Sequence, residues 1–217
     1  MAKRGLLSAL ILTLLMSNAA SPAYSQPWKA VADLPAYISV SNELCRGGQP
    51  SVDGLRQLKE KGIKTIISLR NNKQLTEQES AEAQKLGIKF ISIPMNGIQK
   101  PSTTEIETFL HTVGDKESQP VFVHCEEGVD RTGTMVGIYR IATDHWTAKQ
   151  AYGEMLKRGF HPIYAWLADS VFDFEEHYGK PSKGRPWGAK IIDTLENAKT
   201  FFSLNHNKSK GAEHPLG

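Results

Sequence analysis

The residues of this chain best suited to chemistry are Cys125 and Arg131, which are separated by five positions. The apolar residues 120–123 precede them and the helix-compatible residues 134–143 follow, so the pattern predicts a strand, a loop and a helix. Such a loop points backbone N–H groups inward, and the helix adds the positive end of its dipole. The loop is therefore expected to bind a tetrahedral dianion between a thiolate and a guanidinium.

The stretch from His124 to Thr132 resembles the signature His-Cys-x5-Arg-Ser/Thr of cysteine-dependent phosphatases of the protein tyrosine and dual-specificity class, and it matches at every position. The resemblance implies that Cys125 attacks phosphorus and that a phosphocysteine forms and is hydrolysed, with no cofactor. It also implies that His124 shapes the loop and that Thr132, with Arg131, helps to stabilise the departing thiolate. The phosphate-binding residues are expected to be Glu126, Glu127, Gly128, Val129, Asp130 and Arg131.

The sequence allows two other interpretations of Cys125. In the first, Cys125 is a small buried hydrophobe without a chemical role. In the second, it belongs to an anion-binding loop of the rhodanese-like sulfurtransferase type. The rhodanese loop does not need the Arg131-Thr132 pair. The preceding strand, the glycine at position 128 and the immediate start of a helix favour the phosphatase.

The sequence around this motif predicts an α/β fold in which a central, mainly parallel sheet is flanked by helices, like that of dual-specificity protein tyrosine phosphatases. Strands are expected at residues 37–40, 44–46, 63–69, 88–93 and 120–123. Helices are expected at residues 52–61, 76–86, 102–113, 131–143, 147–158 and 163–177. The core faces of the last three helices are expected to include Met135, Ile138, Tyr139, Ala151, Met155, Trp166, Leu167 and Phe172.

The resemblance covers about residues 44–177. The helical end, including 139–141, 154–155 and 158–160, is similar to bacterial periplasmic tyrosine phosphatases. Near the front, an Arg-x-Gly-Gln-Pro stretch also resembles bacterial dual-specificity-like phosphatases. It implies that Arg46 or Gln49 approaches the site.

The general acid is where this sequence departs from the family. Related enzymes place an aspartate for this role on a loop upstream of the cysteine, but residues 94–101 contain no carboxylate, and Asn96 has no titratable proton. Asp130 is the nearest carboxylate in sequence, and myotubularin-like loops suggest the same residue. In the alternative, Asp130 points outward and only tunes the potential of the loop. Glu126 and Glu127 are further candidates.

Both ends of the chain differ in composition from the middle. Residues 1–25 have a basic start and a short apolar run followed by small residues, which predicts a cleaved signal peptide and export to a bacterial periplasm, or secretion. Residues 26–180 are expected to form the catalytic domain. The basic tail, 181–217, is expected to carry one helix at 189–202 that docks on the domain or contacts an anionic membrane surface.

Charge and cysteine content limit the partners. Without residues 1–25 the chain has 24 basic and 23 acidic residues, which gives no reason to expect nucleic acid. No Cys/His cluster has metal-site spacing, so no metal is predicted, and histidines other than His124 are expected at the surface or at helix ends. The expected partner is a phosphorylated protein substrate, and the chain is expected to be monomeric.

Substrate choice rests on the charge of the loop. Glu126, Glu127 and Asp130 repel a polyphosphorylated inositol, so phosphotyrosine on proteins, with phosphoserine or phosphothreonine as further substrates, is the first expectation. Aspartate directly before the arginine also resembles phosphoinositide phosphatases, which makes a phosphoinositide the second. The third is a catalytically weak module that binds phosphopeptides.

The chain contains two cysteines, Cys45 and Cys125. In an oxidising compartment the nucleophile is at risk, and Cys45 is its only possible disulfide partner. The alternative is that Cys45, in a predicted strand, is a buried inert thiol.

Overall fold

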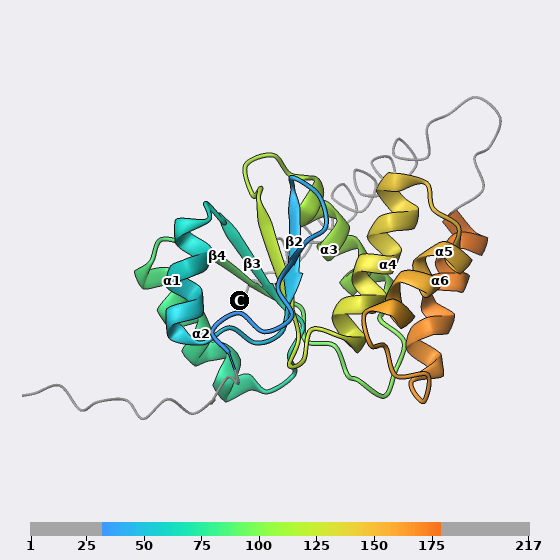
Figure 1. Ribbon diagram of the computed structural model, residues 1–217, viewed down its shortest axis with the longest axis horizontal. Coiled ribbons are helices and arrows are strands. Elements are labelled where there is room, and N and C mark those ends of the chain that lie inside the picture. Colours follow the sequence, from blue (N-terminus) through green and yellow to red (C-terminus); the bar gives the residue numbers. More distant parts are fainter. Residues whose placement is uncertain (1–31, 179–217) are drawn as a thin grey trace, which may run out of the picture.

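The strand that ends at the cysteine is the centre of the sheet. A computed structural model describes residues 32–178, and its five-stranded sheet has the order β1-β2-β5-β3-β4 (Figure 1). The strands are β1 (Ile38–Ser39), β2 (Leu44–Gly47), β3 (Thr65–Ser68), β4 (Lys89–Ser92) and β5 (Val121–His124). Only β1 runs antiparallel to its neighbour among the described pairs, so the predicted mainly parallel sheet is confirmed.

Alternation along β5 divides the core into two layers. Val121 and Val123 pack into the larger apolar cluster on one face, whereas Phe122 packs into a second cluster on the other face. All three side chains are fully buried, and each contributes about 1.5–3 kcal/mol through the hydrophobic effect. Burial on both faces holds the end of β5, and therefore the start of the loop that follows, in a fixed place.

The helices cover the two faces unequally. Helices α1 (Val52–Glu60) and α2 (Lys73–Lys85) supply the smaller cluster and lie on one side of the sheet (Figure 1). The other four helices lie on the opposite side and supply the larger cluster. They are α3 (Thr103–Gly114), α4 (Asp130–Asp144), α5 (Ala148–Lys157) and α6 (Ala165–Tyr178).

Local signals set most helix starts. The Ser51 side chain accepts a hydrogen bond from the Gly54 N–H at the start of α1, as expected for an N-cap. Capping boxes at Ser102 and Thr147 open α3 and α5. The predicted boundaries of these three helices are therefore confirmed to within one or two residues.

Two predicted helix starts are wrong. Helix α2 begins at Lys73 rather than at residue 76, because the Asn72 side chain accepts a hydrogen bond from the Leu75 N–H and caps the helix earlier. Helix α6 begins at Ala165 rather than at residue 163, two positions further from Pro162 than expected.

One predicted core residue is also wrong. Phe172 is 44% exposed, because the buried face of α6 is formed by neighbours such as Leu167, Val171 and Phe174. Trp166 is half-buried and donates a hydrogen bond from Nε1 to the Gly97 carbonyl, 3.0 Å away. The other apolar positions expected in the core of these helices are buried, as predicted.

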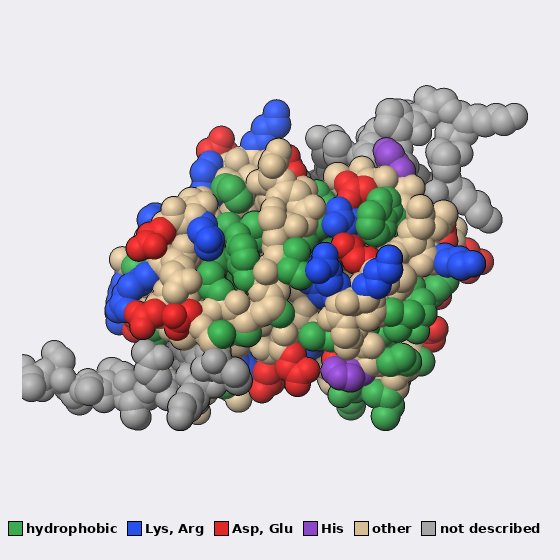
Figure 2. All heavy atoms as spheres, in the orientation of Figure 1, with side chains coloured by type: hydrophobic (Ala, Val, Ile, Leu, Met, Phe, Trp, Pro, Cys, Tyr) green, Lys and Arg blue, Asp and Glu red, His purple; other side chains and the backbone are tan. Residues whose placement is uncertain are grey.

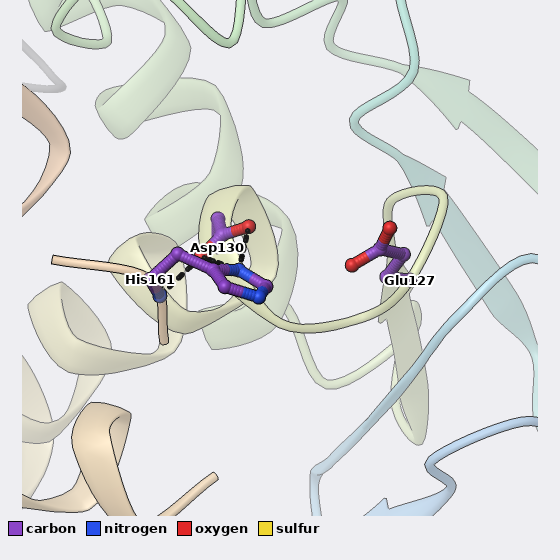
Figure 3. Close-up of side chains that lie close together, drawn as sticks. All are labelled: Glu127, Asp130 and His161. Atoms are coloured by element: carbon purple, nitrogen blue, oxygen red, sulfur yellow. Dashed lines mark hydrogen bonds and ion pairs between the residues drawn. The ribbon is translucent and has the colours of Figure 1, made fainter. Parts of the chain in front are cut away.

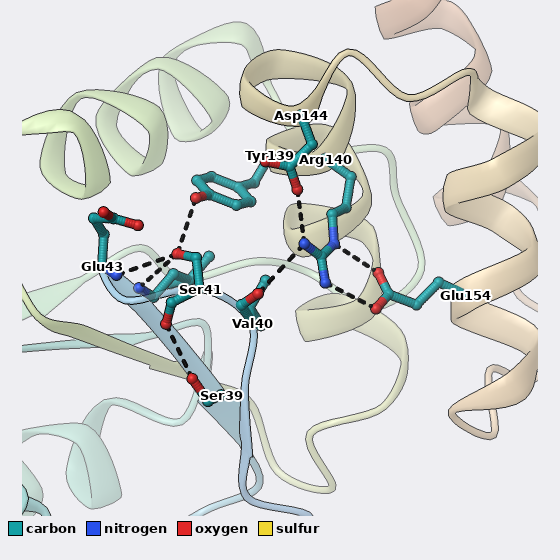
Figure 4. A network of polar contacts seen from close by, with 9 residues as sticks. Ser39, Val40, Ser41, Glu43, Tyr139, Arg140, Asp144 and Glu154 are labelled. Carbon is teal, nitrogen blue, oxygen red and sulfur yellow. Dashed lines mark hydrogen bonds and ion pairs between the residues drawn. The ribbon is translucent and has the colours of Figure 1, made fainter.

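A polar network ties the helical side to the segment between β1 and β2 (Figure 4). Arg140 on α4 donates two hydrogen bonds to Glu154 on α5, with distances of 3.0 and 3.1 Å. The same guanidinium reaches Asp144, 2.7 Å away, and the Val40 carbonyl, 3.4 Å away. Because a guanidinium can donate five hydrogen bonds, one side chain joins two helices to the edge of the sheet.

The predicted signal peptide, 1–25, and the predicted tail with its helix at 189–202 lie outside the described residues. Across positions 32–178, no helix combines the length and the apolar character required to cross a membrane.

Candidate active site

The loop after β5 brings Cys125 and Arg131 together. Cys125 is buried, and its Sγ accepts a hydrogen bond of 3.3 Å from the Gly128 N–H. Arg131 lies in the first turn of α4 and donates from Nη1 to the Leu69 carbonyl, 3.3 Å away at the end of β3. Helix α4 starts without a side-chain cap at Val129, which leaves its first N–H groups available to an anion. The predicted strand, loop and helix are confirmed.

Arg46, near the end of β2, fixes the orientation of this loop by binding two of its carbonyl groups. Its Nη2 donates to the Gly128 carbonyl at 2.7 Å and to the Val129 carbonyl at 3.4 Å. In a trans peptide the N–H points opposite to the carbonyl, so holding these carbonyls on one side turns the next N–H groups to the other. Burial lowers the pKa of the Arg46 guanidinium, whereas Glu154 and Cys125 oppose this shift through their negative charges. The predicted approach of Arg46 to the site is confirmed.

Gln49 joins the loop to a second buried arginine. The Gln49 N–H donates to the Glu126 carbonyl at 2.9 Å, and its Oε1 accepts from Arg70 Nη1 at the same distance. Arg70 also forms an ion pair of 3.3 Å with the Glu126 carboxylate. The sequence analysis assigned no role to Arg70, which directly follows the strand predicted at residues 63–69. Its position after a strand directed toward the loop was the signal that could have identified it.

His124 lies at the base of the loop and is in buried contact with a carboxylate. Its Nδ1 lies 3.0 Å from the Cys125 carbonyl, and its Nε2 lies 2.9 Å from Glu79 Oε1 on α2. Both side chains are fully buried, and the contact has the distance of an ion pair without the alignment of a hydrogen bond. Glu79 was missed because an acidic residue inside a helical pattern ordinarily indicates an exposed face.

The remaining predicted loop residues differ in their exposure. Thr132 is buried, and its Oγ1 has no hydrogen-bond partner among residues 32–178, so it remains available to the nucleophile or its leaving group. Glu127 is exposed, and Val129 is the N-cap residue of α4. The groups of the loop that are suited to an anion are its backbone N–H groups at the uncapped start of α4, rather than these side chains.

An open pocket of about 570 Å³ lies over the loop. Cys125, Glu126, Glu127, Asp130 and Arg131 line it from the loop and α4. Residues from three other segments complete the wall: Asn71, Asn96, Gly97, Ile98, His161, Ile163, Tyr164 and Leu167. The predicted site residues are thus brought together at the carboxyl end of the sheet.

The segment at 94–101, in which the resemblance led us to look for a general acid, borders the pocket. Asn96, Gly97 and Ile98 line the pocket, and the Asn96 side chain accepts a hydrogen bond of 3.2 Å from the Ile98 N–H. The side chains that this segment contributes to the pocket are therefore those of Asn96 and Ile98, and neither is a carboxylate.

Asp130 turns toward His161 instead of outward (Figure 3). Asp130 Oδ1 accepts from the His161 backbone N–H at 2.9 Å, and the His161 Nδ1 lies 3.1 Å from Oδ2. Polar atoms of Glu127, Asp130 and His161 all lie within 4.8 Å of one another. His161 was expected at the surface or at a helix end, and it is exposed as predicted. Its contact with Asp130 was not foreseen, because sequence spacing does not show that residues 31 positions apart meet.

The two cysteines pack on opposite faces of the sheet. Cys45 pairs in register with Phe122 and belongs to the smaller cluster, whereas Cys125 belongs to the larger one. Three residues along a strand span about 10 Å, which exceeds the roughly 7 Å limit between the Cα atoms of a disulfide. Cys45 accepts a hydrogen bond from the Tyr37 hydroxyl, and burial followed by this contact raises the pKa of Tyr37 to about 12.

Mild peroxide is therefore expected to oxidise Cys125 alone and to form no bridge to Cys45. Mass spectrometry of the intact and digested protein would measure both products. A Cys45–Cys125 disulfide in the folded protein would contradict this geometry. A Cys45→Ser variant is the control, and its Cys125 should oxidise at the wild-type rate.

A family model described as DSP-PTPase phosphatase fused to NAD+ kinase matches residues 28–163. The chain belongs to this DSP-PTPase phosphatase family. The predicted enzyme class and the family resemblance are confirmed by this match, which covers β1 to β5 and the whole loop. The family description names a kinase fusion, but the matched part of this chain is the phosphatase part.

Two curated relatives extend the comparison. NAD kinase 2, chloroplastic, from Arabidopsis thaliana is 36% identical over 123 residues, which are 55% of this chain and 12% of that protein. Dual specificity protein phosphatase TpbA from Pseudomonas aeruginosa is 24% identical over 140 residues, which are 64% of this chain and 61% of TpbA. The chain thus spans about a tenth of the first relative and less than two thirds of the second.

Two solved structures of TpbA resemble this fold, and a further relative is named for an inositol substrate. The crystal structure of TpbA has a TM-score of 0.57 at 21% identity and covers 81% of this chain and 98% of its own. A variant of TpbA was solved in complex with pTyr, with a TM-score of 0.52. Inositol diphosphatase DSP2 from Oryza sativa is 23% identical over 80% of this chain and 78% of its own length. The predicted dual-specificity-type fold is confirmed.

Proposed function

We propose that this phosphatase hydrolyses phosphotyrosine on proteins through a phosphocysteine formed at Cys125. The observation that carries the proposal is the composition of the pocket. Arg131 is the only lysine or arginine among its lining residues, whereas Glu126, Glu127 and Asp130 are acidic. One guanidinium and the loop N–H groups suit a single phosphoryl group.

The walls of the pocket suit an aromatic leaving group. Ile98 is 69% exposed and Ile163 is 77% exposed, and both line the pocket with Tyr164. Figure 2 shows hydrophobic side chains beside acidic ones and a histidine at the lower edge of this face. A tyrosine ring would bury part of this apolar surface, and burying about 40 Å² contributes roughly 1 kcal/mol.

A phosphoinositide is the second candidate, because Asp130 directly before Arg131 resembles phosphoinositide phosphatases, and the name of the rice relative adds an inositol diphosphate. A polyphosphorylated ring would bring several negative charges toward a pocket in which Glu126 is paired with Arg70 and Asp130 with His161. Glu127 has no such cation among the described residues, and Arg131 is the one guanidinium of the lining. Like charges in a partly enclosed pocket weaken binding, so the pocket favours the single phosphate of a tyrosine.

The test is turnover of a phosphotyrosyl peptide, a phosphoseryl peptide, a phosphoinositide and a diphosphoinositol phosphate under one set of conditions. We expect kcat/KM for the phosphotyrosyl peptide to exceed the others by at least about tenfold, a difference of roughly 1.4 kcal/mol. A higher value for either inositol compound would overturn the proposal. Failure on every substrate would favour the phosphopeptide-binding module.

Ile163→Ala provides a sharper test of the aromatic wall. We expect a loss of about fivefold in kcat/KM for the phosphotyrosyl peptide and little change for the phosphoseryl peptide, because only the ring reaches the isoleucine. Leu156→Ala is the matched control, since Leu156 is an exposed side chain of α5 that does not line the pocket.

A further inference from the structure

His161 is the titratable group of the pocket that the phosphatase signature does not account for. It lies in the segment between α5 and α6 and lines the same pocket as Cys125 and Arg131. Its side chain is 53% exposed, so a bound substrate can reach it. No carboxylate is offered by the segment at 94–101, so the pocket still needs a group that protonates the leaving oxygen.

The contact with Asp130 orients the His161 ring and engages Nδ1, so that Nε2 is the nitrogen left for a substrate. His161 Nδ1 lies 3.2 Å from Asp130 Oδ1 and 3.1 Å from Oδ2, and the His161 backbone N–H is bound to Oδ1. A carboxylate only accepts, so Nδ1 carries the hydrogen of this contact. Figure 3 shows the ring extending from Asp130 toward Glu127, which lines the same pocket, so the second ring nitrogen, Nε2, is the one not engaged by Asp130.

We propose that His161, and not Asp130, donates the proton to the leaving oxygen, with Asp130 as its positioning residue. The proposal rests on the proposed phosphatase function and deepens it. It assigns the two members of one hydrogen-bonded pair to different tasks. Asp130 holds the imidazole in place, and Nε2 meets the substrate.

The charges around His161 favour the protonated imidazole. Hydrogen bonding to Asp130 on α4 and its negative charge raise the pKa of His161, and Glu127 in the loop adds a smaller effect in the same direction. The Tyr164 ring lies edge-on at 6.2 Å between centroids, and Arg131 is the cation that shares the pocket. The donor form of His161 is thus retained to higher pH than for a free histidine and is lost as pH rises through the elevated pKa.

Both chemical steps balance with this assignment. In the first step the Cys125 thiolate forms the S–P bond, the P–O bond to the leaving group breaks, and the proton on His161 Nε2 moves to the departing oxygen. In the second step water loses a proton to the neutral Nε2 and forms an O–P bond, while the S–P bond breaks and the thiolate returns. Phosphate leaves, and the imidazolium is restored.

The other carboxylates of the loop are differently engaged. Both oxygens of Asp130 accept from His161, and Glu126 is paired with Arg70 at 3.3 Å. Glu127 is exposed in the pocket and is therefore the rival that the experiment must include.

The experiment measures kcat/KM against pH for a series of aryl phosphates whose leaving groups range from activated to tyrosine-like. His161→Gln is expected to lose about 10²–10⁴-fold on the tyrosine-like members and less than tenfold on the most activated one. The alkaline limb of its profile should disappear. Asp130→Asn should retain the limb but shift it to lower pH, because the charge that raises the pKa of His161 is gone. His177→Gln, on α6 and outside the pocket, is the control.

Several outcomes would overturn the assignment. If Asp130→Asn removes the alkaline limb and His161→Gln retains it, Asp130 is the proton donor. If Glu127→Gln is the one variant that removes the alkaline limb, Glu127 is the proton donor. Equal slowing of all aryl phosphates by His161→Gln would indicate a structural role. The substrate proposal is tested separately: a wild-type enzyme that hydrolyses the aryl series but not phosphotyrosyl peptides would contradict that proposal and leave the assignment of His161 in place.

Discussion

A Cys125→Ser variant is expected to lose turnover completely while it still binds phosphate or vanadate. The serine hydroxyl is a far weaker nucleophile than the thiolate, and loss of a covalent nucleophile costs on the order of 10⁶-fold in kcat. The anion cradle should survive, because it consists of backbone N–H groups held by Arg46, Gln49 and the start of α4. Hydrolysis of an aryl phosphate and calorimetric titration with phosphate would measure the two effects.

Two variants make this result specific. Arg131→Ala should lose both turnover and anion binding, because it removes the one guanidinium that lines the pocket. Cys45→Ser should keep both, since Cys45 packs on the other face of the sheet and a serine can still accept from Tyr37. Substantial activity in the Cys125→Ser protein would rule out the covalent mechanism.

The sequence predicted those parts of the fold whose causes are local. Gly62, Gly87 and Gly159 directly follow the helices predicted at 52–61, 76–86 and 147–158, and each has a positive φ, from 66° to 91°. The start of the helix predicted at 102–113 is local in the same way, since all atoms of its capping box come from four consecutive residues. The Asn72 cap was missed because asparagine also fits the polar loop that was assigned there.

Apart from Arg46 and Gln49, which a resemblance to related phosphatases indicated, the site was predictable where its residues are adjacent in sequence. Cys125 to Thr132 form one loop, and the chemistry of a thiolate beside an arginine requires that spacing. By contrast, the buried pair of Glu79 and His124 joins α2 to the end of β5, and His161 comes from a segment beyond α5. Their contacts depend on how the helices pack, which hydrophobic periodicity does not specify.

Gly128→Ala is expected to abolish phosphate binding and turnover. Gly128 has a φ of +79°, which costs a residue with a side chain about 1–3 kcal/mol. An added Cβ would also lie 2.3 Å from the Gly47 backbone carbon and 2.4 Å from the Gly48 nitrogen. Because both neighbours are backbone, relief requires the loop to move away from the segment that supports it. Phosphate titration, turnover and the free energy of unfolding would be measured together.

Gly62→Ala separates strain from collision. Gly62 has a nearly identical φ of +81°, but an added Cβ there has nothing within 4 Å. The Gly62→Ala control should therefore show only the cost of a positive φ for alanine, a loss of about 1–2 kcal/mol in the free energy of unfolding, and it should retain full activity. If Gly128→Ala behaves like Gly62→Ala, the loop tolerates movement away from Gly47 and Gly48, and close backbone packing is not what holds the N–H groups toward the phosphate. If the loss in the free energy of phosphate binding exceeds the loss in the free energy of unfolding, Gly128 acts mainly by keeping the loop in its binding position.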